Sequence, residues 1–220
     1  MFKDSTYMMK RLLLFLLIIP LTSSSQTISY YNIYSNLIDK NFLEWKINTD
    51  SVTSVIVVNA LTKFTINSEL TEIIDDMINN NDKSIYNFIR FYDKPIDILN
   101  NNEFKILLND FKTKLTKKTE LSADSFKCKV PVRIVKKERI ERIFGKKIFN
   151  NSDRAWKKFN KEYLTNQGYY EFSNVAYSEN FAIVYVVHRA NPLNGKGELE
   201  FFKKENGNWN RMANYGIWFN

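Results

Sequence analysis

The chain has 220 residues, of which 44% are hydrophobic and 25% charged, and its formal net charge at pH 7 is +8. This length is enough for one good-sized domain or two small ones that bury a core without disulfide bonds. With a single cysteine and a single histidine, the sequence excludes an intramolecular disulfide and a metal site built mainly from these two residue types.

The N-terminal segment has the three regions of a secretory signal peptide. Lys10 and Arg11 form a positive region, residues 12–21 are ten consecutive apolar residues, and residues 22–25 are small. Ten apolar residues span about half of the ~20 that a transmembrane helix requires. We therefore expect residues 1–25 to be a signal peptide that is cleaved after Ser25.

Export of the mature chain follows from this segment. The mature protein is expected to begin at Gln26 and to be periplasmic or secreted, with no transmembrane segment. No cysteine follows the apolar region, which excludes a lipid anchor on an N-terminal cysteine. The start codon stays open, because Met8 and Met9 directly precede Lys10 and either could replace Met1.

The first half of the chain predicts helices separated by short strands. Residues 30–45 carry apolar side chains at helical spacing, and the β-branched residues 52–58 indicate a buried strand. Ser68 can cap a helix whose apolar residues recur at i, i+3, i+4, i+7 and i+8 up to Asn79. Residues 85–92 are ambiguous between helix and strand.

Further elements follow up to residue 144. Phe104 to Leu115 predicts an amphipathic helix with lysines on its outer face. Residues 128–135 predict a strand in which Cys128 points inward and Pro131, which has no N–H, indicates a sheet edge or a bulge. Residues 137–144 fit a short helix or a turn.

The C-terminal part predicts one helix and four strands. Ser152 can cap a helix with Trp156 on its apolar face, and Gly168 lies beyond its end, where a left-handed residue is common. Asn206-Gly207 is a strong signal for a two-residue hairpin turn. The four expected strands are residues 169–177, 181–189, 197–204 and 209–218.

Together these elements predict an α+β fold. N-terminal helices and short strands precede a C-terminal four-strand antiparallel meander that a helix packs against. We expect residues 26–220 to form a single domain, and a subdivision near residues 125–150 stays open.

Lys and Arg gather in three runs, at residues 112–118, 127–142 and 146–161. In an exported protein such runs could bind anionic lipid headgroups, an anionic polysaccharide or an acidic protein. They could equally form a solvated face, since Glu138 and Glu141 are interspersed among them. Nucleic acid is not expected as a partner, given the export signal and the absence of a recognised nucleic-acid motif.

The search for catalytic or ligand-binding residues yields no candidate site. His188 on a central strand and Cys128 are interpreted as structural, and Gly195-Lys196-Gly197 lacks the remaining residues of a phosphate loop. We expect the two glycines to adopt positive φ in a turn between strands. Carboxylate pairs and aromatic residues that could form a sugar site are Asp75 with Asp76, Glu138 with Glu141, and Trp209, Trp218, Tyr169, Tyr170 and Tyr215.

The chain from Arg154 onward resembles a family of uncharacterised exported bacterial proteins. The shared features are a tryptophan helix, a serine-bearing strand, an A-[IL]-V-Y strand, a G-x-G turn and a lysine-rich strand followed by G-x-W. They correspond here to Trp156 and Phe159, Ser173, residues 182–185, residues 195–197 and residues 207–209. Some members carry two cysteines where this chain has Ala190 and Asn194. The resemblance implies no activity, cofactor or catalytic residue.

The favoured interpretation is a non-catalytic binding or interaction module of the periplasm or cell exterior. One alternative is a cell-wall or glycan hydrolase that uses paired carboxylates, which would need two carboxylates facing each other across a cleft. Another is a secreted inhibitor or an immunity-like protein. No catalytic, cofactor-binding or metal-binding residue is assigned at this level.

Overall fold

A computed structural model describes residues 30–42, 54–59, 68–79, 84–93, 97–115, 117, 120–145, 153–164 and 167–219. The predicted signal peptide, residues 1–25, lies outside the described residues. So do the predicted helix cap Ser152 and the lysines of residues 146–150.

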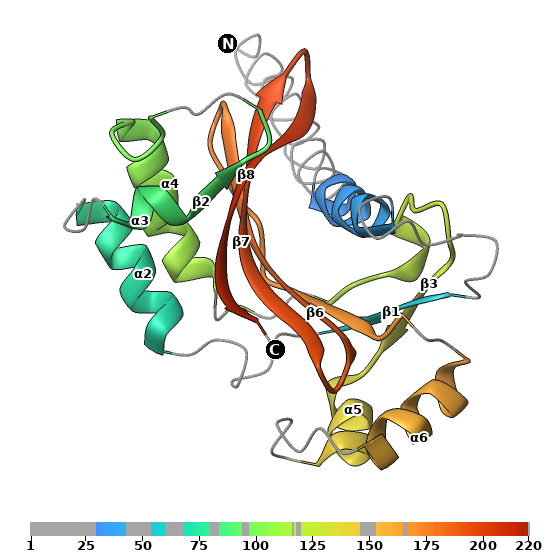
Figure 1. Cartoon of the computed structure of the whole chain (residues 1–220). Coiled ribbons are helices and arrows are strands. Elements are labelled where there is room, and N and C mark those ends of the chain that lie inside the picture. Colours follow the sequence, from blue (N-terminus) through green and yellow to red (C-terminus); the bar gives the residue numbers. More distant parts are fainter. Residues whose placement is uncertain are drawn as a thin grey trace, which may run out of the picture.

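The described strands form one mixed sheet of eight strands, in the order β2-β8-β7-β6-β4-β1-β3, with β5 also paired to β6. Figure 1 shows that the three longest strands, β6 to β8, bend strongly around the helical segment 30–42. The strands are β1 (Val55–Val58), β2 (Ile89–Phe91), β3 (Val132–Val135), β4 (Tyr169–Phe172), β5 (Ala176–Tyr177), β6 (Phe181–Asn191), β7 (Asn194–Glu205) and β8 (Asn208–Phe219).

The predicted C-terminal meander is confirmed. Strands β4, β6, β7 and β8 are antiparallel neighbours in that order. Asn206 and Gly207 join β7 to β8 with φ of 51° and 80°, which is the positive φ that a type I′ turn needs at both central positions. The predicted first strand is divided into β4 and β5, both of which pair with β6.

Strands from the first half of the chain extend this meander at both edges. β1 lies between β3 and β4 and is parallel to both, while β2 pairs with β8 in antiparallel fashion. β3 is therefore an edge strand, as Pro131 predicts, but it begins at Val132 rather than Cys128. The fold is α+β, with a sheet that is mixed rather than restricted to the C-terminal part.

Six α-helical segments and one short 3-10 helix, η2 (Ala123–Ser125), are described around the sheet. Asn101 caps α4, because its side-chain Oδ1 accepts a hydrogen bond from the backbone N–H of Phe104 at 3.1 Å. The ambiguous residues 85–92 belong to α3 and β2. The segments are residues 30–42, α2 (Ser68–Asn79), α3 (Ser84–Phe88), α4 (Asn102–Lys114), α5 (Lys137–Phe144) and α6 (Asp153–Tyr163).

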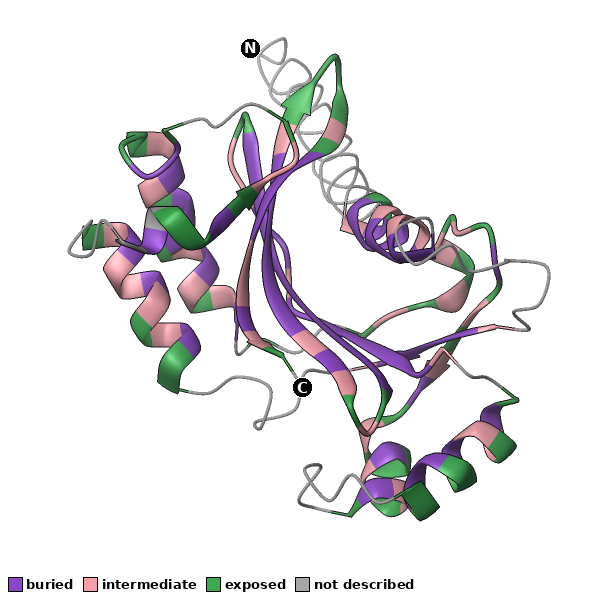
Figure 2. Cartoon of the chain, in the orientation of Figure 1, coloured by how far each residue is buried: buried purple, intermediate pink, exposed green. Residues whose placement is uncertain are grey.

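Both faces of the sheet are covered, and Figure 2 shows β6 and β7 buried along most of their length. The segment 30–42 covers one face, with side chains of β1, β4 and β6 beneath it. On the other face, α2 and α4 cover β6, β7 and β8, whereas α5 and α6 cover β1, β3 and the start of β4. The predicted tryptophan helix α6 thus reaches the meander at its first strand.

Two expectations about glycine require correction. Gly195 and Gly197 lie inside β7 without positive φ, and the turn before this strand is formed by Pro192 and Leu193. A Cβ at Gly197 would come within 2.2 Å of the Trp218 indole nitrogen, so glycine there makes room for that ring. The left-handed residue that directly follows α6 is Leu164 (φ 51°), and the predicted Gly168, four residues further on, also has positive φ (70°).

Candidate functional site

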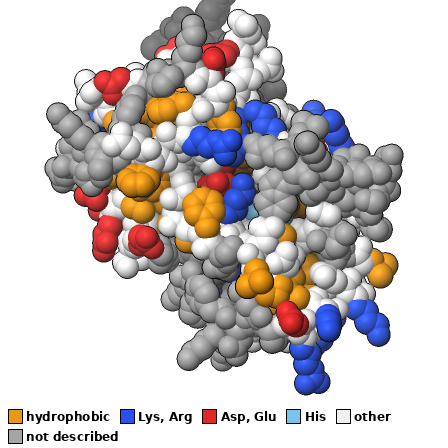
Figure 3. Space-filling model, in the orientation of Figure 1, with side chains coloured by type: hydrophobic (Ala, Val, Ile, Leu, Met, Phe, Trp, Pro, Cys, Tyr) orange, Lys and Arg blue, Asp and Glu red, His pale blue; other side chains and the backbone are white. Residues whose placement is uncertain are grey.

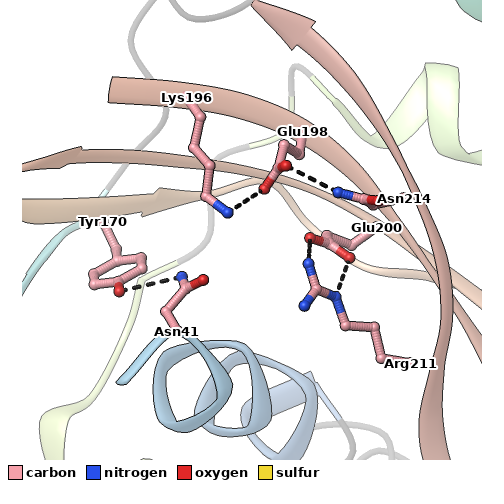
Figure 4. A network of polar contacts seen from close by, with 7 residues as sticks. All are labelled: Asn41, Tyr170, Lys196, Glu198, Glu200, Arg211 and Asn214. Carbon is pink, nitrogen blue, oxygen red and sulfur yellow. Dashed lines mark hydrogen bonds and ion pairs between the residues drawn. The ribbon is translucent and has the colours of Figure 1, made fainter. Parts of the chain in front are cut away.

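A row of polar side chains lies on the sheet face that residues 30–42 cover. In a strand every second side chain points to the same face. In β7 this alternation places Lys196, Glu198 and Glu200 on the face where Phe202 packs under residues 30–42. Both glutamates are buried. Figure 4 shows this row with its partners Arg211 and Asn214 from β8, and beside it the separate pair of Tyr170 from β4 and Asn41 from the helical segment.

Glu200 is held by Arg211 of the neighbouring strand β8. The Arg211 Nε and Nη2 atoms donate to the two carboxylate oxygens of Glu200 at 2.6 Å and 2.5 Å. Both side chains are 1% exposed, and the guanidinium also lies 4.1 Å from the centre of the Tyr92 ring. Burial raises the pKa of the Glu200 carboxyl and Glu198 adds to the rise, whereas Arg211 lowers it.

A β-bulge gives Arg211 its place in this pair. Glu200 lies opposite Asn214 and Phe202 lies opposite Arg211, so the register between β7 and β8 shifts by one residue. Such a shift turns the following side chains to the other face of the strand. Met212 consequently packs among residues under α2 and α4, and Arg211 faces Glu200.

Glu198 has a cation on one side and an amide on the other. The Lys196 Nζ lies 2.7 Å from Glu198 Oε2, and the Asn214 Nδ2 donates to Glu198 Oε1 at 2.9 Å. The row on β7 and β8 therefore contains two carboxylates and two cations, matched one to one. This arrangement, in which each buried carboxylate has its own cation, is typical of structural ion pairs.

His188 and Tyr170 continue the polar region toward β4. Their residues lie opposite each other on β6 and β4, and their rings stack at 4.2 Å. The His188 Nε2 lies 2.9 Å from the Gln167 carbonyl oxygen, and since a carbonyl only accepts, Nε2 carries the proton. Burial lowers the pKa of His188 to about 4, so the imidazole is neutral at pH 7. Asn41 in turn donates to the Tyr170 hydroxyl at 3.2 Å.

Cys128 is less buried than its alternation predicts. It precedes β3 and packs against the core under residues 30–42 with intermediate exposure. Burial raises the pKa of its thiol to about 11, partly offset by a hydrogen bond with Ser35. The thiolate, which is the reactive form, is therefore a minor species at neutral pH.

The carboxylate pairs considered from the sequence do not form a site. Asp75 forms an ion pair with Lys112 across α2 and α4 at 2.6 Å. Glu141 lies 3.5 Å from Lys137 on the same helix. The inward pair is Glu198 and Glu200 instead. Their signal in the sequence is the alternation of two glutamates with Leu199 and Phe201 in a strand flanked by apolar strands.

The aromatic residues considered as a sugar-binding face are separated by the fold. Tyr169 packs under α5 and α6, Tyr170 lies under residues 30–42, and Trp218 and Tyr215 pack on the side of α2 and α4. Trp209 lies beside Tyr177 at the far end of the meander, with ring centres 5.5 Å apart. These aromatic residues therefore provide core and edge packing on different faces.

The basic runs have different environments. In the first run Lys112 and Lys114 form ion pairs on α4, with Asp75 and Asp110. In the last run the outer face of α6 presents four exposed cations that form no ion pair with another described residue. Figure 3 shows Lys and Arg side chains at its lower right, where α5 and α6 lie. The four are Arg154, Lys157, Lys158 and Lys161.

The spacing of these four cations gives α6 a one-sided charge. Positions i, i+3, i+4 and i+7 share a face of a helix, and Trp156, Phe159 and Tyr163 occupy the opposite, buried face. The nearby Glu162 is engaged by Arg139 of α5 at 2.6 Å. The helix therefore presents four cations on one face, with Asp153 at its N-terminal end, and we call these four residues the basic face of α6.

Within the described parts of the chain, no three His, Cys, Asp or Glu residues are grouped so as to hold a metal ion. The described helices include none with the length and apolar character needed to cross a membrane. Comparison of the chain with protein-family models, curated proteins and solved structures finds no match in any of the three.

Proposed function

We propose that this protein is an exported, non-catalytic interaction module that binds an anionic partner through the basic face of α6. The observation that carries the proposal is the contrast in pairing between the two charged regions. Glu198 and Glu200 have a cation each, whereas Arg154, Lys157, Lys158 and Lys161 form no close ion pair with another described residue; Glu162, which is near Lys158, is bound by Arg139. Unpaired exposed cations on one face create a positive potential that attracts anions.

The arrangement of the sheet face supports a non-catalytic role. A general acid or base must exchange a proton with a bound substrate, and a nucleophile must reach it. Glu200 is fully enclosed with Arg211, and Glu198 contacts Lys196 and Asn214. His188 is hydrogen-bonded through the nitrogen that carries its proton.

Export is supported by the sequence of residues 10–25. N-terminal sequencing of the protein recovered outside the cytoplasm should begin at or near Gln26. Recovery only from the cytosol, with the N-terminal segment intact, would contradict this part of the proposal. The proposed binding of an anionic partner would not be affected by that result, because it is tested separately with dextran sulfate.

Binding to a soluble anionic polysaccharide tests the basic face. We expect the mature protein to bind dextran sulfate, with an affinity that falls steeply between low salt and 0.5 M salt because screening weakens exposed charges. A variant with Arg154, Lys157, Lys158 and Lys161 changed to glutamine should lose at least tenfold in affinity. Isothermal titration calorimetry measures both the salt dependence of the wild-type affinity and the affinity of the variant.

The matched control removes positive charge elsewhere. Lys117→Gln with Lys204→Gln changes two exposed lysines outside α6, one just after α4 and one on β7. This variant should retain wild-type affinity within about twofold. Because the control removes two charges and the α6 variant four, an equal loss per charge removed would show a response to net charge only and would overturn the proposed site. Failure of the wild-type protein to bind dextran sulfate would overturn the proposal.

A second candidate is a hydrolase, favoured by one observation. Glu198 and Glu200 share a sheet face, and the pKa of Glu200 is raised, as in a general acid. If this function holds, hydrolysis of cell-wall glycan by the purified protein should be abolished by Glu200→Gln. The contacts with Arg211 and Lys196 make this function the weaker of the two.

A further inference from the structure

The end of the sheet beside α6 carries exposed apolar side chains. Among the described residues, large hydrophobic side chains with high exposure include Leu164 (71%), Leu193 (84%) and Phe219 (68%). Leu164 directly follows α6, Leu193 lies in the turn between β6 and β7, and Phe219 ends β8. We call these three residues the apolar tip.

Strand register places Phe219 and Leu193 at one end of the sheet, and the chain after Leu164 returns to that end at Gly168. Phe219 pairs with Lys196, which lies three residues after Leu193, so the Cα atoms of Phe219 and Leu193 are about 10 Å apart at ordinary strand spacing. Gly168, four residues after Leu164, packs against the backbone of residues 189–190 in the last part of β6. Figure 1 shows the β6–β7 turn at the same end of the sheet as α5 and α6.

Two of these side chains are set by their local backbone, and at Leu164 the backbone is strained, whereas the Phe219 ring lies against Gly216. The backbone N–H of Leu193 donates to the Asn191 side chain at 2.9 Å, which fixes the turn with the leucine exposed. Leu164 has φ of 51°, a conformation that glycine or asparagine adopts with less strain than leucine. An exposed leucine there contributes little to the core, so its presence points to a contact with another molecule.

We propose that the apolar tip and the basic face of α6 together dock the protein on an anionic lipid surface. Membrane-surface binding combines buried apolar side chains with Lys and Arg that contact anionic headgroups. A soluble acidic polymer would use the cations but gain nothing from the leucines. This inference rests on the proposed anion binding and identifies the anionic partner of the protein as a lipid surface.

Vesicle binding tests the partner. The mature protein should co-sediment with vesicles of 70% phosphatidylcholine and 30% phosphatidylglycerol and not with pure phosphatidylcholine. The glutamine variant of α6 should bind the anionic vesicles at least a hundredfold more weakly, since each cation near such a surface contributes roughly fivefold. The double variant Leu164→Asn, Leu193→Asn should lose about tenfold on vesicles and keep its affinity for dextran sulfate.

The control for the leucines is Ile106→Asn, which changes an equally exposed apolar residue on α4. It should leave vesicle binding unchanged, and thermal melting of all variants verifies their folding. Binding of dextran sulfate without binding of anionic vesicles would overturn the lipid inference and leave the proposed function intact. Vesicle binding that is insensitive to the leucine variants would overturn the role of the apolar tip. Binding of neither probe would overturn both proposals.

Discussion

This protein has two rows of charged side chains, one buried in the sheet and one exposed on α6. The row on β7 and β8 is buried, and each carboxylate there has one cation as its partner. The row on α6 is exposed and consists of four cations that form no ion pair with another described residue. Each row contains four charged side chains, and the rows differ in burial and in pairing. The comparison indicates that a binding site for a charged partner is to be sought at exposed charges without an ion-pair partner, outside the core.

The largest effect is expected from breaking a pair in the buried row. Arg211→Met leaves Glu200 without its bidentate partner in a fully enclosed position. Removing one partner of a buried ion pair costs about 3–5 kcal/mol. Urea unfolding at pH 7 should therefore show a loss of this size in the free energy of unfolding.

A double variant sharpens the same point. Glu200→Leu combined with Arg211→Met removes both charges and should recover most of the stability that the single change loses, since apolar residues can replace a buried pair. If Arg211→Met alone unfolds at the wild-type urea concentration, the pair is not held in the core as described. The contrast with the exposed row would then disappear.

The next effect concerns the pH dependence of the buried region. The pKa of folded His188 is lowered to about 4 from its ordinary value of 6.5, because burial disfavours the charged ring. Its contribution to stability is therefore fully present above pH 6.5 and is lost as the pH falls toward 4. The shift corresponds to about 3 kcal/mol.

The variant His188→Gln isolates this contribution. The difference in unfolding free energy between wild type and variant should shrink by about 3 kcal/mol from pH 7 to pH 4. The Glu200 carboxyl acts with the opposite sign over this range, since its raised pKa favours the fold as the pH falls. Glu200 is present in both proteins, so its effect cancels in the difference. A difference that does not change with pH would show that the pKa of His188 is not lowered in the folded state.

The smallest effect on stability is expected from the exposed row. Glutamine at Arg154, Lys157, Lys158 and Lys161 should change the free energy of unfolding by no more than about 0.5 kcal/mol, because exposed surface changes are usually neutral. Urea unfolding measures this change on the same protein used for binding. A loss of several kcal/mol would mean that these residues support the fold, and the two rows would then not differ in role.

Local patterns predicted much of the fold. The apolar repeat of α2, the Asn206-Gly207 turn and the two-sided apolar strand β6 each follow from a few neighbouring residues. The position of β1 between β3 and β4 could not be predicted in this way. Parallel pairing joins segments that are far apart in the chain, and no short pattern specifies which strands become neighbours.

The candidate site was predictable only in part. The basic residues of α6 and their helical spacing are visible in the sequence, and so is the alternation of Glu198 with Glu200. The partner of Glu200 is not visible in the sequence, because a β-bulge decides whether Arg211 or Met212 faces Glu200. The same limit applies to Gly197, whose space is occupied by Trp218 and Tyr185 from neighbouring strands.

The place of β1 in the sheet also has a consequence for folding kinetics. Val55–Val58 pairs with Val132–Val135 on one side and with residues 169–171 on the other, so both of its partners follow more than 70 residues later. Sheets with such distant pairings form slowly, because long loops must close before the contacts stabilise them. During synthesis β1 cannot pair with both of its neighbours before residue 171 has emerged. For a chain that is exported as proposed, this delay favours passage across the membrane before folding.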